Sequence, residues 1–133
     1  MKTRMKTLAA VGLVLAAAAA QADIVVIVSA KSSTTTMTAD DIASIYLGKS
    51  SAMKPVDNAA PVRTQFYTKV AGKDEAQVKA IWSKLVFTGK ATPPKELGSD
   101  GDVVKAVGAD ANAIGYVDKA AVDGSVKVVY EVK

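Results

Sequence analysis

The 133-residue sequence contains no cysteine and no histidine. Without cysteine, disulfide frameworks, thiol nucleophiles, thiolate metal sites and a lipid-modified N-terminal cysteine are excluded. Without histidine, the usual general base near neutral pH and the commonest metal ligand are missing. A serine or threonine nucleophile would depend on Lys, Asp or Glu as its base, and no recognised spacing such as Ser-x-x-Lys is present. The carboxylates do not follow a metal-ligand pattern either. We therefore expect no enzyme, no cofactor and no metal site.

The N-terminal region has the pattern of a cleavable signal peptide. Lys2, Arg4 and Lys6 precede an apolar run at 8–20, and Ala20-Gln21-Ala22 follows as a small-x-small cleavage site. The run holds 13 residues, fewer than the roughly 20 that a membrane-spanning helix needs. We expect residues 1–22 to be removed after Ala22, and the mature protein to be periplasmic and not inserted in the membrane.

The charge of the predicted mature chain is nearly balanced. The leader removes three basic residues and no acidic ones from 17 Lys+Arg and 13 Asp+Glu, which leaves 14 against 13. A nucleic-acid partner is not expected, because such binding needs clustered positive charge. Half of all residues are hydrophobic, enough for a core, so residues 23–133 are predicted to form a single domain.

Strand and helix patterns alternate along the mature chain. The β-branched run at 24–28 indicates a strand buried on both faces, and 113–117 indicates a second buried strand. Three capping boxes predict helix starts: Thr38 with Asp41, Asp74 with Gln77, and Ser99 with Asp102. A further helix is expected at 63–70. Alternation over 126–132 predicts a strand with Val126, Val128, Tyr130 and Val132 on one face. The predicted fold class is α/β, with a small mixed sheet flanked by helices.

Four segments, in this order, carry a family resemblance. A helix-like segment at 41–49 ends in Tyr46-Leu47-Gly48-Lys49, and Arg63-Thr64-Gln65-Phe66 follows. The stretch 82–89 runs from Trp82 to Phe87-Thr88-Gly89, and a strand-like segment reads Ala113-Ile114-Gly115-Tyr116-Val117 after Asn112. Together they resemble the phosphate-binding proteins of ABC uptake systems, which have the type II periplasmic binding-protein fold. The resemblance implies one lobe of that fold and phosphate as the ligand.

The sequence also departs from that family. Its members have two lobes, whereas 23–133 is about the size of one. The family's arginine is followed by a Gly-Ser-Gly-Thr loop that cradles the anion, but Arg63 runs directly into Thr64-Gln65-Phe66. The carboxylate that accepts the phosphate proton belongs to the absent lobe. Asp57 is the nearest acidic residue before Arg63, yet no motif connects it with that role.

Arg63 is the strongest candidate for ligand binding. It is the only arginine of the predicted mature chain, and a guanidinium at a helix start combines a bidentate fork with free amides. Thr64 could add a hydroxyl and an amide. Ser32 and Ser33 follow the first strand, where ligands of open α/β sheets often bind; a solvated connector is the alternative for this loop.

Two functional hypotheses remain open from the sequence. The first is a periplasmic domain that binds a small oxyanion, most directly phosphate, and serves ABC-type phosphate uptake or sensing with a permease or sensor as partner. The second is a non-enzymatic interaction module that keeps the lobe but has lost the ligand. Under the first hypothesis a single lobe should bind more weakly than the two-lobed relatives, unless a homodimer or another protein supplies the missing second wall.

Overall fold

The computed structural model describes residues 23–132, so the predicted signal peptide and its cleavage site lie outside the described residues. One five-stranded sheet organises this part of the chain, with strand order β3-β2-β4-β1-β5. The strands are β1 (Ile24–Ser29), β2 (Lys54–Asn58), β3 (Lys95–Leu97), β4 (Ala113–Asp118) and β5 (Val126–Glu131). The predicted mixed α/β class is confirmed.

Strand direction decides which loops share an edge of this sheet. β2 runs parallel to β3 and to β4, whereas β1 runs antiparallel to both of its neighbours, β4 and β5. Ile24 at the start of β1 therefore pairs with Asp118 at the end of β4. The loop after β1 consequently lies at the opposite end of the sheet from the loops that follow β2 and β4.

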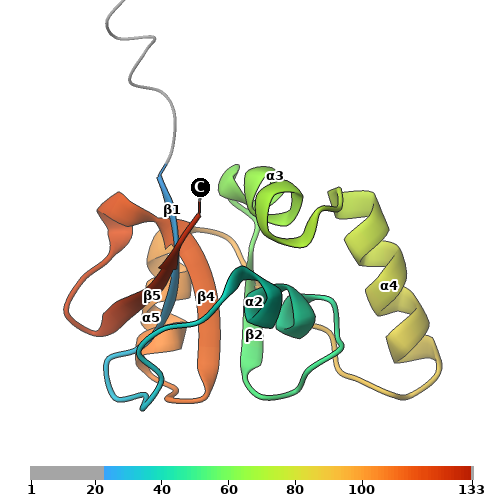
Figure 1. Cartoon of the computed structure of the whole chain (residues 1–133), viewed down its shortest axis with the longest axis horizontal. Coiled ribbons are helices and arrows are strands. Elements are labelled where there is room, and N and C mark those ends of the chain that lie inside the picture. Colours follow the sequence, from blue (N-terminus) through green and yellow to red (C-terminus); the bar gives the residue numbers. More distant parts are fainter. Residues whose placement is uncertain (1–22, 133) are drawn as a thin grey trace, which may run out of the picture.

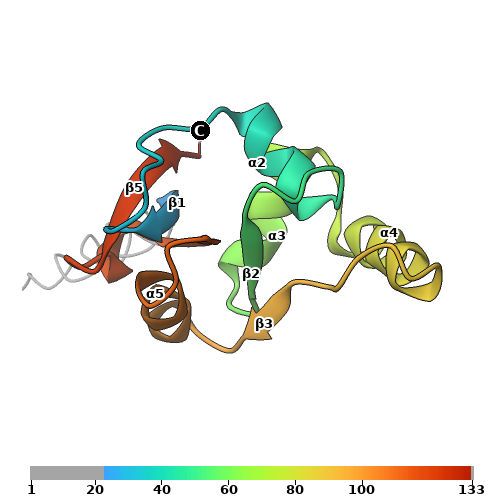
Figure 2. The same cartoon turned by 90° about the horizontal axis from the view of Figure 1, so that it is seen from below.

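Helices cover both faces of the sheet (Figures 1 and 2). On one side lie α2 (Ala39–Tyr46), α3 (Val62–Phe66) and the π-helix η2 (Tyr67–Ala71), and α4 (Glu75–Phe87) packs beside these helices at the edge of the molecule. The other face is covered by α5 (Asp100–Gly108). A short 3₁₀ turn, η3 (Lys119–Ala121), joins β4 to β5.

The central strand β1 confirms the prediction of a strand buried on both faces. All six of its residues are buried. Ile24, Val26 and Val28 pack with the α2–α4 side, whereas Val25 and Ile27 pack with α5. The period-two alternation of side chains thus feeds two separate hydrophobic clusters.

The predicted helix starts are confirmed. Thr38 and Asp74 form complete capping boxes with Asp41 and Gln77, and the Ser99 side chain accepts a hydrogen bond from the Asp102 amide. The helix expected at 63–70 spans α3 and continues as η2, ending at Gly72, whose φ of 68° is left-handed. These signals are local, so the sequence alone defines them.

The predicted single apolar face of the last strand is wrong. The β1–β5 register shifts between Val26 and Ile27, which pair with Tyr130 and Val128, so Val129 is an extra residue. Val129 packs on the α2–α4 side, whereas Val126 and Val128 face α5. A bulge of this kind reverses the alternation within one strand. Strand β3 was not predicted at all.

No helix of residues 23–132 is long and apolar enough to cross a membrane. No group of three or more acidic side chains in the same range is arranged to hold a metal ion.

Candidate functional site

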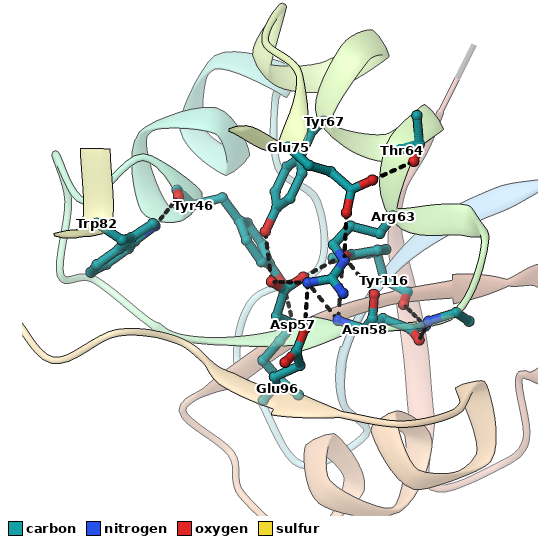
Figure 3. A network of polar contacts seen from close by, with 12 residues as sticks. Tyr46, Asp57, Asn58, Arg63, Thr64, Tyr67, Glu75, Trp82, Glu96 and Tyr116 are labelled. Atoms are coloured by element: carbon teal, nitrogen blue, oxygen red, sulfur yellow. Dashed lines mark hydrogen bonds and ion pairs between the residues drawn. The ribbon is translucent and has the colours of Figure 1, made fainter. Parts of the chain in front are cut away.

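Asp57 at the end of β2 is the centre of a polar network (Figure 3). Its carboxylate accepts a hydrogen bond from the Tyr67 hydroxyl at 2.8 Å and another, through Oδ1, from the Tyr116 hydroxyl. The backbone amide of Asn58 donates to the same Oδ1 at 2.9 Å. Only 13% of the Asp57 side chain is exposed, so these donors replace the water that a free carboxylate would have.

The neighbouring Asn58 joins three elements. It is fully buried, and its Nδ2 donates to Asp100 Oδ1 at 2.7 Å and to the Tyr116 carbonyl at 3.0 Å. Its Oδ1 accepts from the Ala60 amide at 2.9 Å. The start of α5, the end of β2 and strand β4 are thereby held in one arrangement, which fixes the position of Asp57.

Aromatic rings form the floor beneath Asp57. Phe66 stacks on Tyr116 with ring centroids 3.8 Å apart and an angle of 4° between the planes. The buried Tyr46 meets both rings edge-on, and its hydroxyl donates to the Val56 and Ile114 carbonyls. These three residues are fully buried and belong to the core. Burial first, and then the negative charge of Asp57, raises the pKa of Tyr46, Tyr67 and Tyr116.

Arg63 lies in this network between three carboxylates. One guanidinium nitrogen, Nη1, is 3.5 Å from Asp57 Oδ2 and also contacts Glu96 on β3. Nε is 3.2 Å from Glu75 Oε1, although it lacks hydrogen-bonding geometry to that oxygen. Burial alone would lower the pKa of Arg63, but Asp57 and Glu96 outweigh it and raise that pKa. The formal charge of this group of four side chains is −2.

The cavity around Arg63 carries the same acidic character. It has a volume of about 420 Å³, and its charged lining residues are the acidic Asp57, Glu75 and Glu96 and the basic Arg63 and Lys79, so the acidic side chains outnumber the basic ones by one. Thr64 lies beside it, and its hydroxyl donates to Glu75 Oε2 at 2.5 Å. The Arg63 amide donates to the Ala60 carbonyl at 3.0 Å, so it is engaged in the turn that opens α3. Arg63 and Thr64 are therefore brought together, but with carboxylates between and around them.

The two predicted serines are not brought to this site. Ser32 is held near the end of β1, where its carbonyl accepts a hydrogen bond from Lys127 Nζ at 2.6 Å. Ser33 is exposed in the same loop. Because β1 is antiparallel to β4, this loop lies at the far end of the sheet from Arg63. The rule that placed them near a ligand assumed that the first strand runs parallel to its neighbours.

Sequence reasoning missed most of the acidic partners of Arg63. Glu96 belongs to the unpredicted strand β3, and Glu75, in the first turn of α4, was not singled out. Asp57 was noticed because of its proximity to Arg63 in sequence, without a role. A cluster of acidic positions that converge only in space leaves no spacing pattern in a single sequence.

The fold defines a class of protein: one lobe of the type II periplasmic binding-protein architecture. Several solved structures share it, among them two proteins named for phosphate ABC transport and one PstS. A phosphate ABC transporter substrate-binding protein from Clostridium perfringens with bound phosphate matches at a TM-score of 0.65 and 21% identity, over 81% of this chain and 44% of that one. An ABC-type phosphate transport receptor from Vibrio cholerae matches at a TM-score of 0.54 and 17% identity, over 81% of this chain and 45% of that one. PstS from Borrelia burgdorferi matches at a TM-score of 0.60 and 12% identity, over 81% of this chain and 46% of that one.

These matches establish the shared fold, and the chain spans less than half the length of the structures it matches. No protein-family model matches the sequence. No curated protein matches it either. The resemblance stated from the four sequence segments is thus confirmed at the level of the fold.

Proposed function

We propose that the chain is an exported, non-enzymatic module of the substrate-binding-protein fold that acts by contacting a partner protein, without holding a free oxyanion at Arg63. The observation that carries this proposal is the enclosure of Arg63 by Asp57, Glu75 and Glu96. A dianion that approached the guanidinium would meet three like charges at close range, and it would have to displace existing ion pairs. This favours a structural role for the only arginine of residues 23–132.

Helix α4 supplies a surface suited to such a contact. Phe87 is 91% exposed and Val86 is 45% exposed; among the described residues these are the exposed large hydrophobic side chains. Both line an open groove of about 450 Å³ together with Trp82 and Pro93. Figure 1 shows α4 at the edge of the molecule, away from the sheet. Exposed apolar patches with polar surroundings mark interaction sites.

Phosphate binding at Arg63 and Thr64 is the second candidate function. It is favoured by the fold shared with a phosphate-bound protein. In this case the domain would serve phosphate uptake or sensing with an ABC transporter permease or a sensor, and a second copy or another protein would close over the ion. A single lobe buries less of a ligand than two, so weak binding would be expected.

Calorimetric titration with phosphate and with sulfate separates the two candidates. The mature chain is expected to give no binding heat at millimolar anion. Heat that disappears in Arg63→Ala and persists in Lys119→Ala, an exposed-lysine control, would overturn the proposal in favour of the second candidate. Because Arg63→Ala leaves three carboxylates without their cation, Arg63→Lys and a thermal melt of each variant would show whether folding is intact.

Partner contact can be tested directly with a photo-crosslinking residue at position 87. The proposal expects a discrete crosslinked product in the periplasm of cells that express the full chain, and the same product when Arg63→Ala is added. The same residue at position 65, on the exposed Gln65 of α3, is the matched control. A product at position 65 only, or none at either, would contradict the use of α4. A crosslink to a second copy would identify a homodimer as the partner.

A further inference from the structure

A second cavity lies beside the Arg63 cavity and has the opposite electrostatic character. It has a volume of about 640 Å³ and is enclosed by the α2–β2 loop, the start of β2, and the segment that joins α4 to β3. Trp82 and Pro93-Pro94 line both cavities and so separate them. Small-molecule sites commonly measure about 300–1,000 Å³, so the space suits a ligand of modest size.

Lysines surround this second cavity. Lys49, Lys90 and Lys95 line it, and none of them takes part in an ion pair of the described residues. Lys54 also lines it and forms an ion pair with Asp110 at 2.8 Å. Asp110 is the only acidic residue among those that line the cavity. The sequence stretch 76–95 contains four lysines and no acidic residue. An anion in this cavity would therefore meet an excess of positive charge.

The floor of the cavity is apolar. Ile45, Val56 and Trp82 line it and are buried, and Met53 is partly buried beside them. Hydroxyl-bearing side chains at Ser50, Ser51 and Thr92 lie around the same space. The Trp82 indole is held in place by a 2.7 Å hydrogen bond from its Nε1 to the Tyr46 carbonyl. A fixed aromatic surface next to exposed cationic side chains suits a ligand with one apolar part and one charged end.

We propose that this cavity binds a small amphiphilic anion, meaning a molecule with one phosphate or carboxylate group and an aromatic or aliphatic body. The charged group contacts Lys49, Lys90 and Lys95, and the body lies against Trp82 and Met53. The site differs from the Arg63 cavity in sign of charge, and it uses residues that the oxyanion hypothesis did not include. It goes beyond the partner-binding function proposed above and does not require it.

Phenyl phosphate is a suitable probe, because Trp82 is the only tryptophan of the chain and lines this cavity, so its fluorescence should respond to a bound ligand. Trp82 also lines the Arg63 cavity, and the variants below distinguish the two. We expect a saturable change in Trp82 emission of the mature chain. In the triple variant Lys49→Gln, Lys90→Gln and Lys95→Gln, the dissociation constant should rise about tenfold or more, since charge-assisted hydrogen bonds are lost. The matched control, Lys31→Gln with Lys69→Gln and Lys119→Gln, removes the same charge elsewhere and should change it less than twofold.

Two further ligands and one further variant make the test decisive. Inorganic phosphate and benzyl alcohol should each bind about tenfold more weakly than phenyl phosphate or worse; equal binding by either would overturn the amphiphilic class. If the Arg63→Gln variant still binds phenyl phosphate, the result supports the lysine-lined cavity. If the variant no longer binds it, the ligand lies in the Arg63 cavity and the proposal is overturned. No saturable signal at millimolar phenyl phosphate would overturn the proposal. Phosphate binding that depends on Arg63 alone would instead contradict the proposed function and leave the lysine cavity untouched.

Discussion

The hydroxyl of Tyr116 on β4 donates a hydrogen bond to Asp57 Oδ1 on the neighbouring parallel strand β2. This bond links the interior of the sheet to the charged group around Arg63, because Asp57 is also 3.5 Å from the guanidinium. The Tyr116 ring is fully buried beneath it and stacks on Phe66. The acidic network is therefore anchored in the core and is more than a surface arrangement of charges.

Replacing Tyr116 by Phe should destabilise the protein by about 1–2 kcal/mol, because Asp57 loses a donor in a place that water fills poorly. The ring stack with Phe66 is kept, so the effect isolates the hydroxyl. Urea unfolding followed by circular dichroism measures the change. Tyr130→Phe, on β5, is the matched control, because Tyr130 is only partly buried. Its free energy of unfolding is expected to stay within about 0.5 kcal/mol of that of the unmodified protein. Equal effects of the two substitutions would show that the Asp57 bond contributes nothing.

Arg63→Gln should cost about 1–3 kcal/mol of unfolding free energy, since three carboxylates then face one another without a cation. Only 22% of the Arg63 side chain is exposed. Lys54→Gln is the comparison, because it breaks the Lys54–Asp110 pair whose lysine side chain is 69% exposed. That exposed pair should contribute less than about 1 kcal/mol. If Arg63→Gln were as mild as Lys54→Gln, the guanidinium would be free of its carboxylates in solution.

The sequence predicted the parts of the fold that depend on neighbouring residues. Helix starts were found because Thr38 and Asp74 bond to amides three residues later, and the burial of β1 was found because its run is β-branched throughout. β3 was missed because Lys95-Glu96-Leu97 is short and polar and shows no alternation. The Val129 bulge depends on pairing with β1 and has no local signal.

The candidate site was predicted only in part, for a related reason. Arg63 and Thr64 were selected from one segment and do lie together. Their acidic partners come from β2, α4 and β3, and only the folded sheet brings Asp57, Glu75 and Glu96 to one place. The serine loop lies at the other end of the sheet because β1 is antiparallel to β4, and strand direction cannot be deduced from a hydrophobic run. The sequence therefore identified the polar residues of one segment, Arg63 and Thr64, but it did not predict the net negative charge that the folded site has around them.

Gly115 is a position where the backbone of β4 approaches α5 closely. A Cβ there would lie 2.7 Å from Val103 Cγ1 and 2.9 Å from Val107 Cγ2. Gly115→Ala should therefore destabilise by about 1–3 kcal/mol through overpacking, measured by urea or thermal unfolding. Gly101 within α5 is the matched control, because its Cβ would meet nothing closer than 4.0 Å. Gly101→Ala should be neutral or stabilise by up to about 1 kcal/mol. A neutral Gly115→Ala would mean that α5 can move away from the sheet without cost.

The buried tyrosines should make the fold sensitive to alkaline pH. Burial and Asp57 raise the pKa of Tyr46, Tyr67 and Tyr116 in the native state, while unfolded tyrosines ionise near pH 10. Above that pH the unfolded chain binds fewer protons than the native one, so stability is fully present below about pH 10 and falls as pH rises further. Each such tyrosine contributes a slope of about 1.4 kcal/mol per pH unit.

Urea unfolding between pH 8 and pH 11 should show a nearly flat profile up to about pH 9.5 and a steep decline beyond it. Tyr116→Phe removes one of the three groups, so the decline should become shallower by about one third. Absorbance at 295 nm, recorded on the still-folded protein, checks the cause independently, because it reports ionised tyrosine. Full ionisation of all four tyrosines near pH 10 without unfolding would contradict the burial of these hydroxyls, and a profile unchanged by Tyr116→Phe would remove Tyr116 from the explanation.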